Sequence, residues 1–448
     1  MNKNKNLTDG SPFWTLIKFT VPILLSILLQ ITYGTVDLLI VGQFSDVANV
    51  SGVSIGSQVI QVITSFCVGL SLGTTVLLGR YIGAGEDEKS SKILGASIFL
   101  FAILSVVLSI LVVLLTSPIA VIMQTPSESF EYTKNYLFVS GIGTIFIVVY
   151  NLLGSIFRGI GDSKTPLLTV LFACIANIFL DLILVAGFGM GASGAAIATV
   201  LAQAISVVLS ILIIKRKGLP FHFSKMDISF QLEYTKSILK IGVPSSVQMV
   251  LTGFSFLALT AILNTLGVVA SAAVGIVGKI TGMIMVVPQA FSQSLSAYTA
   301  QNLGAKLIDR TRKGLKYAII VSFVFGAIMT YIAFMHGNVF TILFTDDPAT
   351  TEQAVLYLKS YALDCSLVAF FFSFTGYFNG CGRTTFVMLL SIIGAFAIRI
   401  PISYLFSLLE NTNLFIIGLA IPLSTALQII VAVIYYIITK KKDELKQV

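Results

Sequence analysis

The sequence carries little charge for its length. Of its 448 residues, 11% are charged and 56% are hydrophobic, whereas a soluble domain has about 25% charged residues. Polar side chains are therefore too few to cover a folded chain of this size on every side. This composition excludes a soluble globular protein and predicts a chain that lies mostly in lipid.

Residues of enzyme chemistry are also scarce. The sequence has two histidines, His222 and His336, and they lie far apart. It has no H-E-x-x-H and no G-x-x-x-x-G-K-[ST] motif, so a zinc hydrolase and an ATP-driven pump are not expected. We predict that the protein is not an enzyme and needs no cofactor. Energy for any uphill step would then have to come from an ion gradient.

Cysteine is rare, and its positions exclude a metal motif. The four cysteines fall within or just beyond apolar stretches, at Cys67, Cys174, Cys365 and Cys381. Because they show no metal-ligand spacing, we interpret them as buried small apolar residues rather than disulfide or redox residues.

Long apolar runs fill most of the chain. Twelve of them have about 20 residues or more, enough to cross a hydrocarbon core of ~30 Å. The runs are 13–41, 50–79, 93–115, 136–157, 167–186, 192–214, 238–263, 270–300, 315–335, 356–378, 386–409 and 415–438. We therefore predict an all-α membrane protein with twelve transmembrane helices.

Basic residues occupy every second connection between these runs. They cluster at 80–92, 158–164, 215–240 and 306–316 and near both chain ends, whereas connections such as 43–49, 187–191 and 264–269 contain no Lys or Arg. The positive-inside rule then places both termini in the cytoplasm and favours an even number of spans. Membrane topology accounts for the net charge of +8, and no nucleic-acid partner is expected.

The second half of the chain repeats features of the first. The segment 157–161 (FRGIG) matches 378–382 (FNGCG) at an offset of 378 − 157 = 221, and Pro22 matches Pro244 at 222. We predict two pseudo-symmetric six-helix lobes, 1–217 and 236–448, joined by a cytoplasmic linker, 218–235. Parallel repeats of this kind are typical of transporters that work by alternating access, with the substrate site between the halves.

Acidic side chains lie inside the apolar runs, where a charge costs roughly 2.5–3.5 kcal/mol. Asp37 lies in the first run, Asn177 and Asp181 lie one helical turn apart in the fifth, and Thr199 lies in the sixth. The predicted directions of the runs place all four at similar depth. Oxygen ligands suit Na⁺ and paired carboxylates suit H⁺, so we predict a cation site and leave the ion open. Taken alone, Asp37 could also be an interfacial residue near the outer surface, and the matching Asn177, Asp181 and Thr199 make that alternative weaker.

Other polar residues are candidates for a substrate cavity. Gln30 and Tyr33 share a helical face with the first acid, Gln203 lies one turn beyond the threonine, and Gln58 and Gln61 lie one turn apart in the second run. Hydrogen bonding between helices is an equal alternative for the glutamines.

The second half lacks the two acids. The repeat offset places Leu259 and Ile402 at the positions of Asp37 and Asp181. Charges within its runs occur instead at Lys279, Asp364 and Arg399. We assign Lys279 and Arg399 to the cavity, with charge pairing as an alternative role, and expect Asp364 either to pair with Lys359 or to line the cavity.

Several segments together resemble the multidrug and toxic compound extrusion (MATE) family. They are Pro22 with 37–42 (DLLIVG), 158–166 (RGIGDSKTP), 177–181, 191–199 (GASGAAIAT) and 301–305 (QNLGA). The resemblance implies two six-helix lobes around a V-shaped cavity. It also implies export of amphipathic, often cationic compounds by Na⁺ or H⁺ antiport.

The resemblance also assigns roles to residues. In the family branch with a cation site in the N-terminal lobe, the four ligands match Asp37, Asn177, Asp181 and Thr199. The helix-one glutamine and tyrosine that line the drug cavity match Gln30 and Tyr33. We expect a monomer in the cell membrane that takes small organic substrates. The alternatives are a flippase for lipid-linked or polyanionic precursors with the same lobes, and a passive channel.

Overall fold

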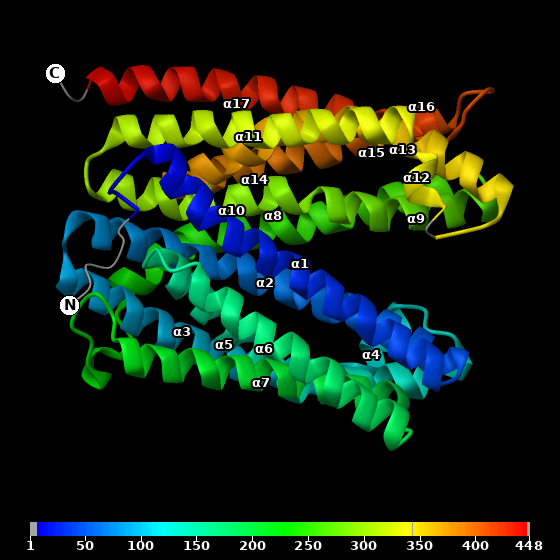
Figure 1. The fold of residues 1–448 in the computed structure, drawn as a ribbon, viewed down its shortest axis with the longest axis horizontal. Coiled ribbons are helices and arrows are strands. Elements are labelled where there is room, and N and C mark those ends of the chain that lie inside the picture. The colour runs from blue at the N-terminus through cyan, green and yellow to red at the C-terminus, as the bar shows by residue number, and fades with distance from the viewer. Residues whose placement is uncertain (1–6, 343, 446–448) are drawn as a thin grey trace. The chain divides into compact units, whose positions relative to one another are not determined.

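The computed structural model describes residues 7–342 and 344–445. Within these ranges every regular element is a helix (Figure 1). Eleven helices of the described chain are long and apolar enough to cross a membrane. A bent pair, α9 (Val268–Ile284) and α10 (Val286–Gly304), turns by 41° and makes a twelfth span when counted as one. The predicted all-α membrane fold with twelve spans is confirmed.

Contacts divide the chain into two compact units. The first consists of Met1–Ser246 with Ala300–Leu307, and the second of Val247–Thr299 with Ile308–Val448. Helices α8 (Leu232–Asn264) and α10 therefore each contribute to both units. Residues 236–246 and 300–307 pack with the first unit, although the repeat boundaries predicted from the sequence place them in the second lobe.

The first unit is built around α5. The other elements of the unit surround it, with α2, α3 and α7 packed directly along it and α1 packed on α6 (Figure 1). The elements are α1 (Pro12–Phe44), α2 (Val47–Ala84), α3 (Asp87–Leu114), α4 (Thr116–Ile122), the 3₁₀ turn η1 (Ser127–Ser129), α5 (Phe130–Gly159), α6 (Lys164–Asp181), the π-helix η2 (Leu182–Gly187), α7 (Gly191–Lys217) and the 3₁₀ turn η3 (Lys225–Asp227).

The second unit has α13 in the corresponding central place, packed against α9, α11 and α17. Its further elements are α11 (Ile308–Met335), α12 (Asn338–Thr341), α13 (Pro348–Gly380), α14 (Thr384–Ile392), the π-helix η4 (Ile393–Arg399), α15 (Ile400–Ser407), α16 (Leu414–Gly418) and α17 (Ala420–Leu445). The central helices α5 and α13 end at Gly159 and Gly380, which are related by the same repeat offset, 380 − 159 = 221.

A hydrogen bond between helices recurs at the repeat offset. The Thr75 hydroxyl donates to the Ser155 carbonyl at 3.0 Å, and the Ser296 hydroxyl donates to the Gly376 carbonyl at 3.1 Å. Donor and acceptor both follow the offset, since 296 − 75 and 376 − 155 each equal 221. The duplication seen in the sequence is therefore also a duplication of packing.

A second bond repeats in the same way. The Ser109 hydroxyl donates to the Gly141 carbonyl at 2.8 Å, and the Thr330 hydroxyl donates to the Ala362 carbonyl at 2.7 Å. Here too 330 − 109 and 362 − 141 each equal 221. Because these bonds join α3 to α5 and α11 to α13, they fix the height of each central helix relative to that neighbour.

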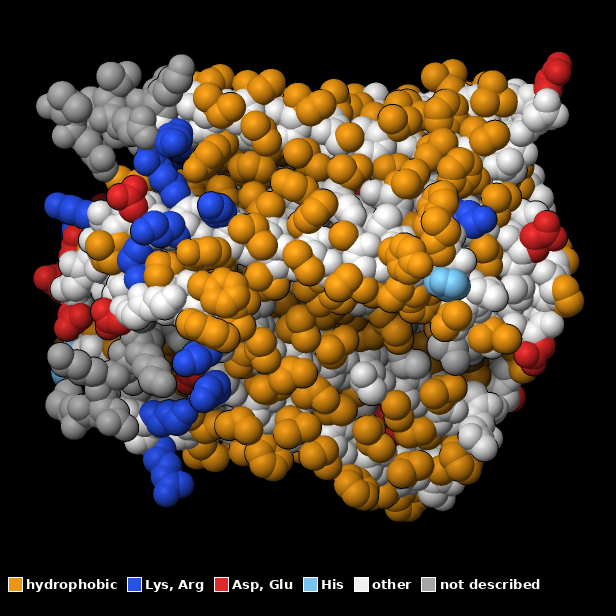
Figure 2. Space-filling model, turned by 45° about the horizontal axis from the view of Figure 1, so that its top comes forward, with side chains coloured by type: hydrophobic (Ala, Val, Ile, Leu, Met, Phe, Trp, Pro, Cys, Tyr) orange, Lys and Arg blue, Asp and Glu red, His pale blue; other side chains and the backbone are white. Residues whose placement is uncertain are grey.

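The outer surface is apolar over the middle of the helices. In each unit, Lys and Arg side chains gather toward one end, and hydrophobic side chains cover the stretch beyond them (Figure 2). Large apolar side chains such as Leu39, Phe172 and Ile434 are half exposed or more, as helices facing lipid require. Residues 1–6 and 446–448 lie outside the described chain, so the cytoplasmic location of the termini stays a prediction.

The cysteines follow the interpretation made from the sequence. Cys67, Cys174 and Cys365 are buried as free thiols, and Cys381 is partly buried. Their place among apolar side chains is that of small core residues.

Candidate functional site

Two carboxyl groups meet inside the first unit. Asp37 on α1 is 6% exposed, and Asp181, the last residue of α6, is fully buried. Their side chains interact directly with each other. Within the described chain, Asp37 Oδ1 and both Asp181 oxygens have no hydrogen-bond donor. Ionised carboxylates can only accept hydrogen bonds, so the contact requires a proton or a cation to relieve their repulsion.

Asn177 and Thr199 complete this group of oxygens. Asn177 is fully buried one turn before Asp181, and its Nδ2 donates to Thr199 Oγ1 on α7 at 3.5 Å. That bond occupies the amide nitrogen and leaves Asn177 Oδ1 without a partner among the described residues. The four predicted ligands therefore come together from three helices and offer mainly oxygen acceptors.

The helix changes its winding at the acid. Helix α6 ends at Asp181, and the π-helix η2 continues the span from Leu182 to Gly187. A π-turn is rare and shifts the register of the residues beyond it relative to an α-helix, and such turns often occur at functional sites. Here the π-turn begins directly after the buried carboxylate.

A hydrogen-bond network fixes the start of α7, two turns before Thr199. Asp46 caps α2 by accepting from the Asn49 backbone N–H at 2.8 Å, which holds the pKa of its exposed carboxyl below the ordinary value. Asn49 Oδ1 in turn accepts from the Ala192 N–H at 2.8 Å. Gly191 has φ +52°, and a Cβ there would lie 2.2 Å from Asn49 Oδ1. Glycine is thus required where α7 begins.

A second glycine lets α5 approach α7 beside the site. A Cβ on Gly143 would lie 2.1 Å from a methyl group of Val200, the neighbour of Thr199. Any larger side chain would push α7 outward. The Asn177–Thr199 contact therefore depends on close packing as well as on its own two residues.

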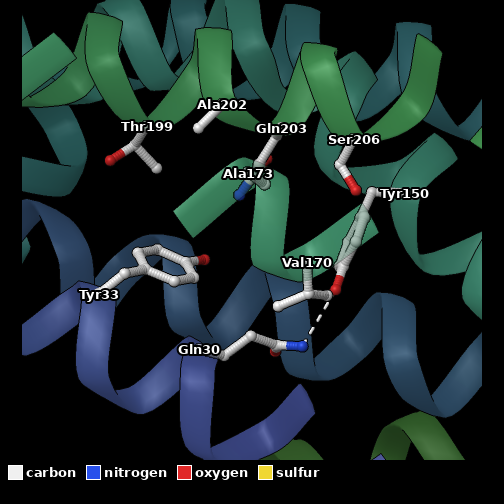
Figure 3. Close-up of a pocket in the computed structure, with 9 residues that line it drawn as sticks. All are labelled: Gln30, Tyr33, Tyr150, Val170, Ala173, Thr199, Ala202, Gln203 and Ser206. Carbon is white, nitrogen blue, oxygen red and sulfur yellow. Dashed lines mark hydrogen bonds between the residues drawn. The ribbon is translucent and has the colours of Figure 1, made fainter. Parts of the chain in front are cut away.

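A small pocket adjoins the carboxylates. Its volume of about 20 Å³ has room for a water molecule or a small ion. Gln30 and Tyr33 reach it from α1, Tyr150 from α5, and Gln203 from α7 (Figure 3). The remaining lining residues are Val170, Ala173, Thr199, Ala202 and Ser206. The structure thus brings together four residues that the sequence singled out, and Thr199 belongs to both the pocket and the oxygen cluster.

The sequence reasoning missed Tyr150. Gln30 Nε2 donates to its hydroxyl oxygen at 3.0 Å, which closes one side of the pocket (Figure 3). The signal in the sequence was weak, because a tyrosine in an apolar run is usually a packing residue or an interface anchor. Only the packing of α5 places it opposite α1.

Two glutamines lie elsewhere. Gln58 and Gln61 on α2 are exposed and do not line the pocket. Their assignment to a substrate cavity stays a prediction, and the pocket of the first unit gives it no support.

The charged candidates of the second half have different surroundings. Lys279 on α9 is exposed, whereas Arg399 at the end of η4 is 7% exposed. Lys359 Nζ lies 5.9 Å from the Phe334 ring centroid, and Asp364 interacts electrostatically with Arg399 instead. The pairing of Asp364 with Lys359, one of the two roles expected for this acid, has no support in the described residues, and its role in the cavity stays a prediction.

Two repeated halves of membrane-spanning helices, with buried carboxylates beside a small pocket, are typical of multi-span membrane transporters. The model of the MatE family matches this chain twice, over residues 22–183 and 244–405. The two matches start at the repeat offset, 244 − 22 = 222, and together cover well over half of the sequence. The chain belongs to the MatE family, as its motifs had indicated.

Relatives span nearly the whole chain. A probable multidrug resistance protein, YoeA of Bacillus subtilis, is 26% identical over 441 residues, covering 95% of this chain and 94% of its own. The multidrug export protein MepA of Staphylococcus haemolyticus is 25% identical over 84% of this chain and 83% of its own.

A solved structure supports the fold. The outward-facing conformation of a multidrug resistance MATE family transporter of the MOP superfamily superposes with a TM-score of 0.92 at 22% identity, over 100% of both chains. The two-lobe fold inferred from the repeat is therefore confirmed.

Proposed function

We propose that this protein is a secondary active exporter that moves small organic compounds out of the cell by antiport with Na⁺ or H⁺. The observation that carries the proposal is the group of buried oxygens at Asp37, Asp181 and Asn177 that have no donor among the described residues. In a low-dielectric interior such a group is costly unless a proton or cation occupies it.

The geometry suggests how ion and substrate are coupled. Thr199 contacts Asn177 in the oxygen cluster and lines the pocket. Binding of a cation at the acids would reorient Asn177 and the Thr199 hydroxyl, and this would change the wall of the pocket. Differential affinity of this kind is the only way in which a ligand can shift a conformational equilibrium.

In this conformation the pocket is too small for an organic compound, so a substrate would bind only in a conformation that enlarges it, and the lining favours amphipathic substrates. Val170, Ala173 and Ala202 supply apolar surface, while Gln30, Tyr33 and Gln203 supply amide and phenol groups. Aromatic rings and nearby carboxylates attract organic cations. The names of the relatives YoeA and MepA refer to multidrug resistance and multidrug export, and we propose the same substrate class here. We also propose a monomer in the cell membrane, with both termini in the cytoplasm.

A flippase for polyanionic precursors would need cationic side chains offered to the ligand. That alternative relied on Lys279 and Arg399. Arg399 Nη1 donates to Ser255 Oγ at 2.9 Å, and its guanidinium lies 4.5 Å from the Phe256 ring centroid. A guanidinium held in this way inside the second unit does not favour recognition of pyrophosphate.

The test is transport by the purified protein in proteoliposomes. Efflux of a fluorescent organic cation is measured under a Na⁺ gradient at equal pH, and separately under a pH gradient without Na⁺. We expect one gradient to drive accumulation against the substrate gradient, and the double variant Asp37→Asn/Asp181→Asn to lose it. Equal downhill flux under both conditions would contradict the proposal and indicate a passive pathway.

A further inference from the structure

The second unit contains its own buried charged cluster. Arg399 is the last residue of the π-helix η4 and is 7% exposed. Its Nη1 donates to Ser255 Oγ at 2.9 Å, and the guanidinium lies over the Phe256 ring at 4.5 Å from the centroid. The arginine is therefore fixed on two sides by residues of α8.

Asp364 on α13 supplies the opposite charge. It is 3% exposed and interacts electrostatically with Arg399, and Thr425, whose hydroxyl donates to the Ile421 carbonyl at 3.2 Å, lies beside its carboxyl group. Tyr361 interacts with both charges. Arg399 Nε and Asp364 Oδ1 are each left without a hydrogen-bond partner in the described chain. Arg399 and Asp364 form no direct ion pair within 4.0 Å, so one donor and one acceptor of complementary charge remain for a bridging water.

This cluster occupies the same place in the fold as the oxygen cluster of the first unit. The ends of the two family matches are related by 405 − 183 = 222. This offset relates Ser255 to Tyr33 and Arg399 to Asn177, and the offset of 221 that relates Ile402 to Asp181 shifts the second correspondence by one residue. The repeated hydrogen bonds of the central helices follow an offset of 362 − 141 = 221. That offset relates Asp364 to Gly143.

The two clusters differ in where the positive charge comes from. In the first unit, no Lys or Arg among the described residues forms an ion pair with Asp37 or Asp181. In the second unit, the guanidinium of Arg399 lies within one residue of the position that corresponds to the ligand Asn177. Arginine stays protonated in proteins, so its charge cannot leave during a transport cycle as a bound ion can.

We propose that Arg399 is a built-in cation that closes the second unit's counterpart of the ion site. The carboxyl group of Asp364 and the hydroxyl groups of Ser255, Tyr361 and Thr425 are oxygen ligands of the kind that monovalent cations accept. With the guanidinium in place, the second unit binds no exchangeable ion. Without its charge, the same oxygens form a site for Na⁺ or Li⁺.

The experiment measures cation binding directly and leaves transport aside. Purified Asp37→Asn/Asp181→Asn protein serves as the background, because it lacks the proposed first-unit site. Arg399→Gln is added to this background, with Arg399→Lys as the matched variant that keeps the charge. The thermal unfolding midpoint is followed across a titration with NaCl or LiCl, with choline chloride holding the ionic strength constant.

We expect the background and the Arg399→Lys variant to show no saturable cation effect. Arg399→Gln should gain one, with the midpoint rising by several degrees, and adding Asp364→Asn should remove it again. A flat response of Arg399→Gln would overturn the proposal. Saturable Na⁺ binding that already depends on Asp364 in the background would overturn it as well. The cation dependence of the unfolding midpoint, measured with and without Asp364→Asn, does not depend on whether the first unit couples export to an ion.

A second comparison, of the stability of Arg399→Gln with that of Arg399→Gln/Asp364→Asn, tests the proposal even if the single variant folds poorly. If Arg399→Gln is destabilised because it strands the Asp364 charge, the double variant Arg399→Gln/Asp364→Asn should recover expression and raise the unfolding midpoint above that of the single variant. If the double variant is no more stable than the single one, the arginine acts through its packing on Phe256 and not as a counter-charge, and the proposal fails.

Discussion

The two units share one packing scheme and use opposite solutions to buried charge. Each central helix is fixed by the same pair of hydroxyl-to-carbonyl bonds at the same offset. In the corresponding region, the first unit brings two carboxylates together, and the second places one carboxylate within electrostatic range of a guanidinium. Duplication of a scaffold therefore preserves backbone geometry, while a few polar substitutions decide whether a unit has an open ion site.

The comparison also shows that one position is glycine in the first unit and a larger residue in the second. In the first unit, Gly143 lets α5 approach α7 and keeps the Asn177–Thr199 contact short. In the second unit, the position related by the offset of 221 is Asp364, a buried carboxyl group. A position that serves helix packing in one half serves electrostatics in the other.

The largest expected effect distinguishes the acids of the two units. Asp37→Asn or Asp181→Asn should reduce gradient-driven export by at least about tenfold, because losing even ~1.4 kcal/mol of cation affinity changes binding tenfold and each change removes a charge at the ion. Asp364→Asn should alter substrate preference or stability more than ion dependence.

The measurement is efflux against the driving-ion gradient in proteoliposomes with equal amounts of each variant. Thermal unfolding checks that all three proteins fold. If Asp364→Asn removes the ion dependence while Asp37→Asn retains it, the roles of the two units are reversed.

An intermediate effect is expected for Thr199→Ala. The hydroxyl contributes one neutral contact, worth roughly 0.5–1.5 kcal/mol, so the cation concentration for half-maximal export should rise by about two- to tenfold. The maximal rate should change much less. Cation titration of transport separates the two quantities, with Thr199→Ser as the control that keeps the hydroxyl. A loss of maximal rate at unchanged cation affinity would place Thr199 in the substrate path alone.

A smaller effect should follow from the pocket bond between Gln30 and Tyr150. Gln30→Ala and Tyr150→Phe should each weaken substrate affinity by a few fold, because a neutral hydrogen bond contributes about 1 kcal/mol. The double variant should be little worse than either single one, since both remove the same bond. Substrate titrations of the wild-type protein and the three variants give a double-mutant cycle. Additive losses would mean that the two side chains contact substrate independently.

The smallest effect concerns the linker, which packs with the first unit. Asp227 accepts from the Ser224 N–H at 2.7 Å and from the Ser91 hydroxyl at 2.9 Å, and these bonds lower its pKa below the ordinary 3.8. Because the folded state favours the carboxylate, this stabilisation is present at neutral pH and is lost as pH falls from 3.8 toward the lower folded pKa.

Asp227→Ala should therefore lower the unfolding midpoint slightly at pH 7, and the difference from the wild-type protein should shrink at acidic pH. Unfolding scans from pH 7 to pH 3 measure both. A difference that grows as the pH falls would show that the Asp227 bonds do not hold the linker.

The sequence by itself determined the class, the span count and the repeat. Apolar runs long enough for a bilayer force helices, since backbone groups in lipid can be satisfied only within the helix or a closed barrel. Buried acids in such runs stand out because a charge in lipid is costly, and helical spacing placed Asn177 and Asp181 on one face. These are local rules, and they need no knowledge of neighbouring helices.

Only the tertiary structure decided which polar residues meet. It joined Gln30 to Tyr150, left Gln58 and Gln61 outside the pocket, and brought Asp364 within electrostatic range of Arg399. Partners on different helices are set by interhelical distances, helix rotation and local changes such as the π-turn after Asp181. Those quantities depend on packing across the whole unit, so spacing within one helix cannot supply them.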